Sequence, residues 1–376
     1  MLDLNKIFNF YYGWWKNIDK FILFLILFLF SLGLFFSLVS TSIIASDKLN
    51  TNTYYFFIKH LFFIILAVVI LVIFSAVNQK QLFEISKYLF FIFLVFLALV
   101  PFIGIEVKGS IRWIDLPLIP RFQPIEILKP FLIVMMSIVF TLNNQKHVYF
   151  KYMLSFLLIL PVILFLISQP DIGQTTLIVL TWFSLIFVSG INLLYFLGFF
   201  ILTFSILFYL VLYVSKFEYI KNRLFAFIDP NSGNNYQSER ASEAISNGGF
   251  FGQGIGEGTL NSKVPEAHTD YIISVISEEF GSIISILLIL IFFYIVFKII
   301  KKTVTENNKY IKISLCGLSS LLIFQTFIHI GVNTSLLPTT GMTLPFLSYG
   351  GSSLLGSAIL AGVILNYTKR RFDDEN

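Results

Sequence analysis

The run FILFLILFLFSLGLFFSLVSTSIIA at residues 21–45 decides the class of the fold. It carries no charged side chain and is longer than the roughly 20 residues that an α-helix needs to cross a bilayer. A helix satisfies every backbone polar group internally, which the bilayer interior requires. The run is too long for the apolar part of a signal peptide and lacks a small-residue cleavage site. It is therefore predicted to be the first membrane span.

Similar apolar runs fill the rest of the chain. Of the 376 residues, 57% are hydrophobic and only 12% are charged, whereas a soluble domain carries about 25% charged residues. The sequence predicts an all-α polytopic membrane bundle, a single domain over residues 1–376. Ten spans are expected, near residues 21–45, 55–77, 86–105, 123–142, 150–168, 171–190, 192–214, 269–299, 311–334 and 347–367. Turn residues alone separate the fifth, sixth and seventh runs, so eight or nine spans are the alternative.

Rare side chains exclude several classes of site. Cys316 is the only cysteine, so neither a disulfide nor a cysteine-based metal site can form. The four histidines are far apart in sequence and show no zinc-ligand spacing, so no structural zinc is expected. The net charge of +5 comes from basic residues that flank apolar runs, which argues against a nucleic-acid partner.

Basic residues also predict the orientation of the chain. With the N-terminus in the cytoplasm, 15 of the 26 lysines and arginines fall on the cytoplasmic side, and Lys129 lies within a span. The 15 are Lys6, Lys16, Lys20, Lys80, Lys87, Lys146, Lys151, Lys298, Lys301, Lys302, Lys309, Lys312, Lys369, Arg370 and Arg371. The outer segments hold the other 10, five of them in one long loop. Because positive charge is retained in the cytoplasm, both termini are predicted to be cytoplasmic, with an even number of spans.

The long outer loop at residues 215–268 interrupts the apolar pattern. It is rich in Asn, Ser, Gly and Glu and contains the glycine-rich run Gly248–Gly258. A structureless loop of this length is usually functional or disordered. Phe250, Phe251 and Ile255 alternate with the glycines, so the loop is expected to pack on the bilayer or on the bundle.

The segment Gln123–Pro130 places ionisable groups at the outer end of the fourth span. Such groups are costly at membrane depth unless they are paired or face a polar cavity. Glu126 and Lys129 are three residues apart on one helix face and can therefore pair. Two readings stay open: a pair that neutralises itself between helices, and a hydrogen-bonding, electropositive wall for an anionic substrate.

A second polar motif, Pro265–Asp270, stands where the long loop enters the eighth span. Asp270, Ser274 and Glu278 are spaced by four residues and would form a polar stripe on one helix face, as in helices that line cavities. The alternative makes Thr269 or Asp270 a helix N-cap, with the preceding charged residues solvated in the loop.

A third motif, Leu336–Ser353, is dense in Gly, Pro, Ser and Thr at membrane depth. Irregular backbone is tolerated there only where it is buried in protein or lines a cavity. A tight re-entrant turn and a phosphate-binding backbone are both consistent with it.

Earlier in the chain, Arg112 and Trp113 are at least an interfacial anchor, and an arginine can also bind a diphosphate bidentately.

Together these motifs resemble the SEDS family, named for shape, elongation, division and sporulation, which includes FtsW and RodA. The resemblance covers residues 109–353 and keeps the motifs in order. They are Gly109–Ile114, Gln123–Lys129, Pro170–Gly173, the glycine-rich loop, Pro265–Tyr271 followed by Glu278 and Glu279, and Leu337–Ser353. The stretches Pro265–Asp270 and Thr343–Pro345 look more like the division branch of the family than the elongation branch.

The resemblance implies a ten-helix peptidoglycan glycosyltransferase that polymerises lipid II on the outer face of the bacterial cytoplasmic membrane, at the division septum. The implied partners are a class B penicillin-binding protein, other divisome proteins and membrane lipids. Within the family, the aspartate that matches Asp270 is the essential acid. Residues that match Glu126 and Lys129 border the same cavity.

The expected chemistry follows from joining two lipid-linked disaccharides. Asp270 is assigned as the general base that deprotonates the acceptor hydroxyl, and Lys129 and Arg112 as stabilisers of the leaving diphosphate. Glu126 would orient Lys129 or hold a divalent cation, Mg or Mn. The expected substrate-binding residues are Glu126, Lys129, Arg112, Gln123, His268, Glu266 and Ser348.

Three alternatives remain from the sequence alone. An elongation polymerase like RodA would use the same residues. A flippase for lipid-linked precursors also needs intramembrane charges and a polar cavity, which would open to both sides of the membrane. A scaffold that only recruits a partner enzyme would function without Asp270.

Overall fold

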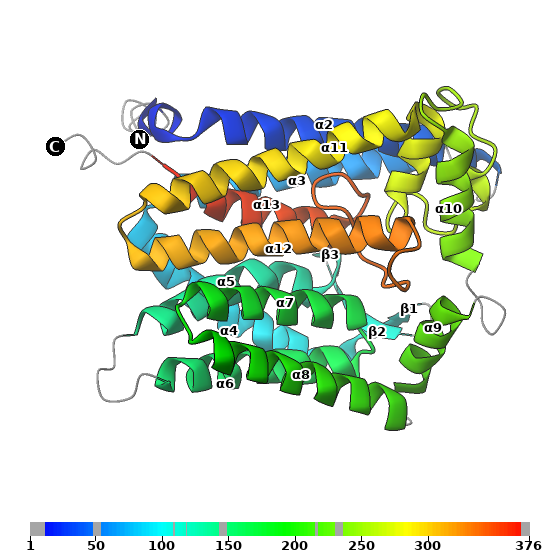
Figure 1. Cartoon of the computed structure of the whole chain (residues 1–376). Coiled ribbons are helices and arrows are strands. Elements are labelled where there is room, and N and C mark those ends of the chain that lie inside the picture. The colour runs from blue at the N-terminus through cyan, green and yellow to red at the C-terminus, as the bar shows by residue number, and fades with distance from the viewer. Residues whose placement is uncertain are drawn as a thin grey trace.

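The computed structural model describes residues 12–47, 54–107, 110–117, 119–142, 149–214, 217–229 and 236–369 as a bundle of long helices (Figure 1). The bundle helices are α2 (Lys20–Asp47), α3 (Tyr55–Ala76), α4 (Gln79–Ile103), α5 (Pro124–Thr141), α6 (Phe150–Ser168), α7 (Ile172–Val188), α8 (Leu193–Tyr213), α11 (Ile272–Thr305), α12 (Lys309–Asn333) and α13 (Gly351–Tyr367). Shorter elements gather at one end: β1 (Ile105–Val107), β2 (Ser110–Leu116), β3 (Ile119–Phe122), α9 (Glu218–Ile228), α10 (Tyr236–Gly248) and a 3₁₀ helix, Asn261–Lys263.

Each predicted span coincides with one of these bundle helices, which confirms the all-α polytopic fold. Among the described residues, eight helices are long and apolar enough to cross a membrane. The other two, α7 and α13, are apolar but have 17 residues each. Nearly every residue of α13 is buried, so this helix is surrounded by protein rather than by lipid.

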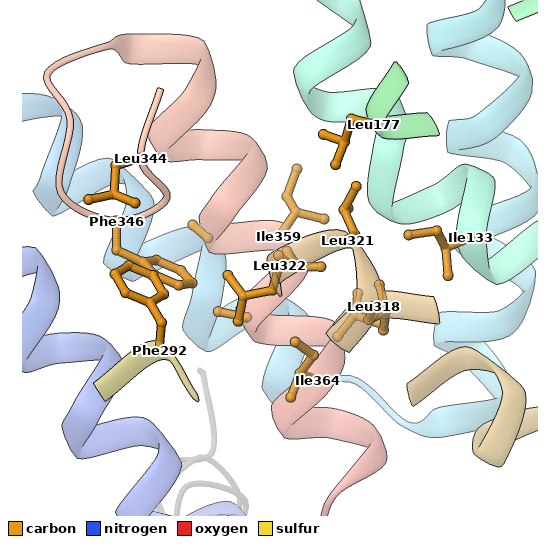
Figure 2. Packing of buried hydrophobic residues seen from close by; sticks show 14 of the residues in the cluster. Ile133, Leu177, Phe292, Leu318, Leu321, Leu322, Leu344, Phe346, Ile359 and Ile364 are labelled. Atoms are coloured by element: carbon orange, nitrogen blue, oxygen red, sulfur yellow. The ribbon is translucent and has the colours of Figure 1, made fainter. Parts of the chain in front are cut away.

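The core lies between α5, α7, α11, α12 and α13. Figure 2 shows Ile133 of α5, Leu321 of α12 and Ile359 of α13 within one apolar cluster, and all three are buried. Nearby, the rings of Phe292 and Phe346 stack with centroids 6.3 Å apart. In contrast, α8 buries none of its residues, as expected of a helix that faces lipid on most sides.

One end of the bundle, here called the termini end, holds the start of α2 and the end of α13 (Figure 1). Trp14 Nε1 donates to Ser75 Oγ at 3.0 Å, beside the last turn of α3. Asn366 Nδ2 donates to Phe74 O at 3.0 Å and to Val77 O at 2.6 Å. The described residues from the start of α2 to the end of α13 form an even number of bundle helices, which accounts for the position of these two points at one end.

The opposite end, here called the loop end, holds β1–β3, α9 and α10 and is more ordered than the sequence suggests (Figure 1). In the sheet, Ile105 pairs with Trp113 and Ile114 with Phe122, all antiparallel. Ile114 and Phe122 form a small apolar cluster with Val100 of α4. The described part of the predicted outer loop, residues 215–268, contains three helical elements that the sequence analysis did not predict: α9, α10 and a 3₁₀ helix.

The glycine-rich run packs on the bundle, as expected, but its backbone rather than its aromatic side chains makes the contact. Gln253 N donates to Glu278 O at 2.8 Å, and Ser282 N donates to Gly249 O at 3.0 Å. Phe250 and Phe251 remain 74% and 87% exposed. The run therefore anchors itself to α11 through close backbone approach and presents its aromatic rings outward.

Gly281 interrupts α11 where the glycine-rich run crosses it. Its backbone angles, φ of 84° and ψ of 166°, are sterically disfavoured for residues that carry a Cβ. An added Cβ would also collide with Phe250 O. We expect Gly281→Ala to destabilise the protein by about 3 kcal/mol, measured as a lower midpoint of thermal unfolding in detergent. Gly198→Ala in α8 is the control, because nothing lies within 4 Å of its added Cβ; equal midpoints for the two variants would contradict the expectation.

Candidate active site at the loop end

Glu126 and Lys129 form the ion pair that their spacing predicts. Both side chains are buried, and Lys129 Nζ lies 2.9 Å from Glu126 Oε2. Gln174 Nε2 of α7 donates to the other oxygen of Glu126, and Lys129 Nζ donates to Gln325 Oε1 of α12 at 3.2 Å. The pair is thus solvated by amides from two neighbouring helices, and its opposite charges compensate each other inside the bundle.

Gln123 and Arg112 meet at Asp171, next to this pair. Gln123 Nε2 donates to Asp171 Oδ2 at 3.0 Å, and Arg112 Nη1 lies 3.6 Å from the same oxygen. Arg112 also donates from Nε to Gln169 O at 3.1 Å and from Nη2 to Pro170 O at 2.5 Å. Burial raises the pKa of the Asp171 carboxyl, and the Arg112 charge opposes that shift. Arg112 therefore holds the turn that begins α7.

Asp270 lies on the turn before α11, not on the helix. Asp270 N donates to Glu266 O at 3.1 Å, and Asp270 O accepts from Asn333 Nδ2 of α12 at 3.0 Å. Its Oδ2 is 3.4 Å from the point where a Cβ on Gly341 would stand. Because α11 begins at Ile272, the predicted stripe from Asp270 along α11 is wrong; the carboxylate faces the connection between α12 and α13.

Glu278 and Glu279 bind the outer segments instead of lining a cavity with Asp270. Glu278 Oε1 accepts from Asn247 Nδ2 at 2.9 Å and from Leu260 N at 2.8 Å. Glu279 Oε1 accepts from Asn261 Nδ2 at 2.5 Å. These two carboxylates secure the ends of the glycine-rich run against α11.

Glu266, His268 and Ser348 lie around Asp270 and support its loop. Ser348 Oγ donates to Thr269 O at 2.7 Å and accepts from Leu344 N at 2.8 Å. Tyr349 N donates to His268 O at 2.9 Å, and the two rings lie 5.4 Å apart. Glu266 has a φ of 55°, which turns the chain sharply before Asp270.

Three residues of α12 connect the two polar regions, and none of them was predicted. Gln325 Nε2 donates to Thr343 O at 3.0 Å, His329 Nδ1 to Met342 O at 2.7 Å, and Asn333 Nδ2 reaches Asp270 O. These three residues, here called the α12 ladder, are buried and spaced by four, a spacing visible in the sequence. Eight residues of helix separate the Lys129 end of this ladder from the Asp270 end, about 12 Å along the axis.

Arg223 of α9 is another residue that the sequence reasoning missed. Its Nη1 donates to Thr339 O at 3.0 Å, two residues before Gly341. Burial and the Asp270 carboxylate raise the pKa of Tyr271, and the positive charge of Arg223 opposes them. Arg223 therefore reaches the segment Thr339–Gly341 that the Asp270 carboxylate also faces, although the sequence offered only its positive charge as a signal.

An apolar pocket of about 570 Å³ lies between α7, α8 and α9. Phe204 and Phe208 of α8 form one wall, and Ile220 and Leu224 of α9 cover it. Asp171 lines the same pocket and supplies the one charged group among its described residues, in a mostly apolar lining that also includes Thr175, Thr176 and Ser205. The pocket suits a long hydrocarbon chain whose head group is polar.

A divalent cation has no built site among the residues that the structure describes. No group of three or more His, Cys, Asp and Glu side chains is placed there to hold a metal ion. The Glu126 carboxylate already contacts Lys129 and Gln174. These residues do not fit the predicted Mg or Mn, and no step proposed below involves a metal.

The fold and this site define a multi-pass membrane protein with a carboxylate-bearing polar region at one end of its bundle. Residues 20–372 match the FtsW/RodA/SpoVE family, described as cell cycle proteins. The chain belongs to this family, as its motifs predict.

Two curated relatives and two solved structures resemble the chain over most of its length. The relatives, each named "Probable peptidoglycan glycosyltransferase FtsW", come from Caulobacter vibrioides (33% identity; 95% of this chain, 91% of the relative) and Francisella salina (35%; 96% and 90%). These names agree with the predicted division branch. A chain of a peptidoglycan synthase complex that coordinates polymerisation and crosslinking gives a TM-score of 0.76 at 24% identity, covering 93% of this chain and 97% of that one. The rod shape determining protein RodA of Thermus thermophilus gives 0.67 at 24%, covering 93% and 96%.

Proposed function

We propose that this protein is a peptidoglycan glycosyltransferase that polymerises lipid II at the outer face of the cytoplasmic membrane. The observation that carries the proposal is the placement of Asp270. Its turn is bonded to Glu266 and to Asn333 of α12, and its carboxylate faces Gly341. A carboxylate held this way at the loop end can accept a proton from a sugar hydroxyl.

In the proposed reaction, Asp270 removes the proton from the acceptor hydroxyl as its oxygen attacks the anomeric carbon of the donor. The new glycosidic bond forms while the bond between that carbon and the lipid diphosphate breaks. The electron pair of the broken bond leaves with the diphosphate oxygen. Asp270 then carries the proton, which it returns to water before the next cycle.

The pocket between α7, α8 and α9 supports a lipid-linked substrate. Its lining is mostly apolar, so it can accept part of a polyprenyl chain from the membrane. Helix α8, which buries none of its residues, forms one wall of the pocket. This wall gives the polyprenyl chain a route into the pocket from the bilayer. Asp270, the residue that we assign to the reaction, lies at the loop end, which favours polymerisation over transport of a lipid through the bundle.

We infer a class B penicillin-binding protein as the partner and the division septum as the place of action. The relatives are named for FtsW, and one solved structure with the same fold belongs to a complex that couples polymerisation with crosslinking. Other divisome proteins and membrane lipids complete the expected surroundings. Exposed Phe250 and Phe251 give the loop end an apolar surface available to such neighbours.

The test is the formation of glycan strands from purified lipid II by this protein together with its penicillin-binding partner. We expect polymer that lysozyme digests. The same preparation in vesicles is assayed for translocation of fluorescent lipid II. Translocation without polymer would replace the proposed function with that of a flippase.

A further inference from the structure

The two cations expected at the leaving group are already compensated in the structure. Lys129 pairs with Glu126 at 2.9 Å. Arg112 contacts Asp171 and two carbonyl oxygens of the preceding turn. The α12 ladder also places Lys129 about two helical turns from the backbone of Asp270. A further positive group close to the Asp270 carboxylate would add to the stabilisation of a diphosphate that leaves there.

Arg223 is a candidate for this group. Its guanidinium donates to Thr339 O at 3.0 Å, and the Asp270 carboxylate packs on Gly341 of the same short segment. Two independent contacts thus place the guanidinium and the carboxylate around one stretch of the α12–α13 connection.

The helix that carries Arg223 also covers the apolar pocket. Ile220 and Leu224 line the pocket from above, and Arg223 lies between them in sequence, one residue from Leu224. The pocket lining and the contact of Arg223 with Thr339 O thus share one helix, α9. This helix therefore joins the site for the lipid tail to the site of the reaction.

We propose that Arg223 binds the diphosphate of the lipid-linked substrate beside Asp270, an assignment that rests on the proposed function. A guanidinium stays protonated and presents parallel N–H donors that match phosphate oxygens. When the diphosphate arrives, N–H groups of the Arg223 guanidinium donate to its phosphate oxygens. As the bond to the sugar breaks, the same donors stabilise the negative charge that develops on the leaving oxygen.

The test compares binding of undecaprenyl diphosphate with binding of undecaprenol, its uncharged analogue, to the full-length protein with its partner in nanodiscs. We expect Arg223→Gln to lower the affinity for the diphosphate by at least about tenfold and to leave undecaprenol unchanged. Arg223→Lys should recover part of the loss. Lys221→Gln is the matched control, because it removes one positive charge from the same helix and should bind both ligands like the wild type.

Three results would overturn the assignment: no binding of the diphosphate by the wild type, full diphosphate affinity in Arg223→Gln, or equal loss of both ligands, which would mark a structural role through Thr339. Binding is read without catalysis, so the two proposals can fail separately. Arg223-dependent diphosphate binding by a wild type that forms no polymer would support the assignment and refute the polymerase.

Discussion

Replacing Asp270 with asparagine will abolish detectable glycan polymerisation, with a fall in rate of at least about 100-fold. Asparagine keeps the size of the side chain but cannot accept the proton of the acceptor hydroxyl. The backbone contacts of residue 270 with Glu266 and Asn333 do not depend on the carboxylate. The fold is therefore expected to survive, and the assay is polymer formed from lipid II with the partner present.

The control for this substitution is Asp115→Asn. Asp115 lies on β2 at the same end of the bundle, and its carboxylate pairs with Arg121 at 3.3 Å with both side chains about half exposed. It should polymerise like the wild type. Normal turnover by the Asp270 variant would remove the general base from the mechanism and revive the scaffold alternative.

Lys129→Met will produce the largest loss of stability, about 3–5 kcal/mol. The substitution leaves the Glu126 carboxylate buried beside Gln174 without the cation 2.9 Å away. A buried charge that loses its partner keeps its desolvation penalty, whereas a neutral pair of similar volume does not. We therefore expect Glu126→Gln combined with Lys129→Met to regain much of the stability, measured as the midpoint of thermal unfolding in detergent.

The matched control is Lys87→Met in α4. Lys87 also pairs with a glutamate three residues away, Glu84, at 2.8 Å, but both side chains are partly or largely exposed. Exposed pairs contribute little, less than about 1 kcal/mol. If the Lys129 and Lys87 variants unfold at the same temperature, burial does not determine how much the Glu126–Lys129 pair contributes to stability, and the prediction for Lys129→Met is wrong.

The membrane spans were predictable because the bilayer imposes a single requirement on all of them. A stretch of about 20 apolar residues has few alternatives to a helix at that depth. The Glu126–Lys129 pair was predictable for a similar reason, since helical spacing places the two on one face. By contrast, β1–β3, α9 and α10 are short and partly polar, and they depend on contacts with bundle helices that local patterns do not contain.

The composition of the candidate site was only partly visible in the sequence. Asp270 and its neighbouring motif stood out because charged residues are rare here. Arg223 did not, because its place near Asp270 depends on how α9 folds across the loop end. The α12 ladder had a readable spacing of four, but its partners are carbonyl oxygens of the α12–α13 connection, which no sequence pattern specifies. Glu278 was assigned to the wrong surface because the start of α11 was placed three residues too early.

The shared position of the start of α2 and the end of α13 matters for anyone who labels this protein. α13 has 17 residues, so a fluorescent protein attached beyond it would be separated from the Asp270 region by the length of that helix, about 25 Å. A label that precedes α2 would lie on the same side. Imaging and pull-down versions of the chain can therefore be built at either position without obstructing the substrate.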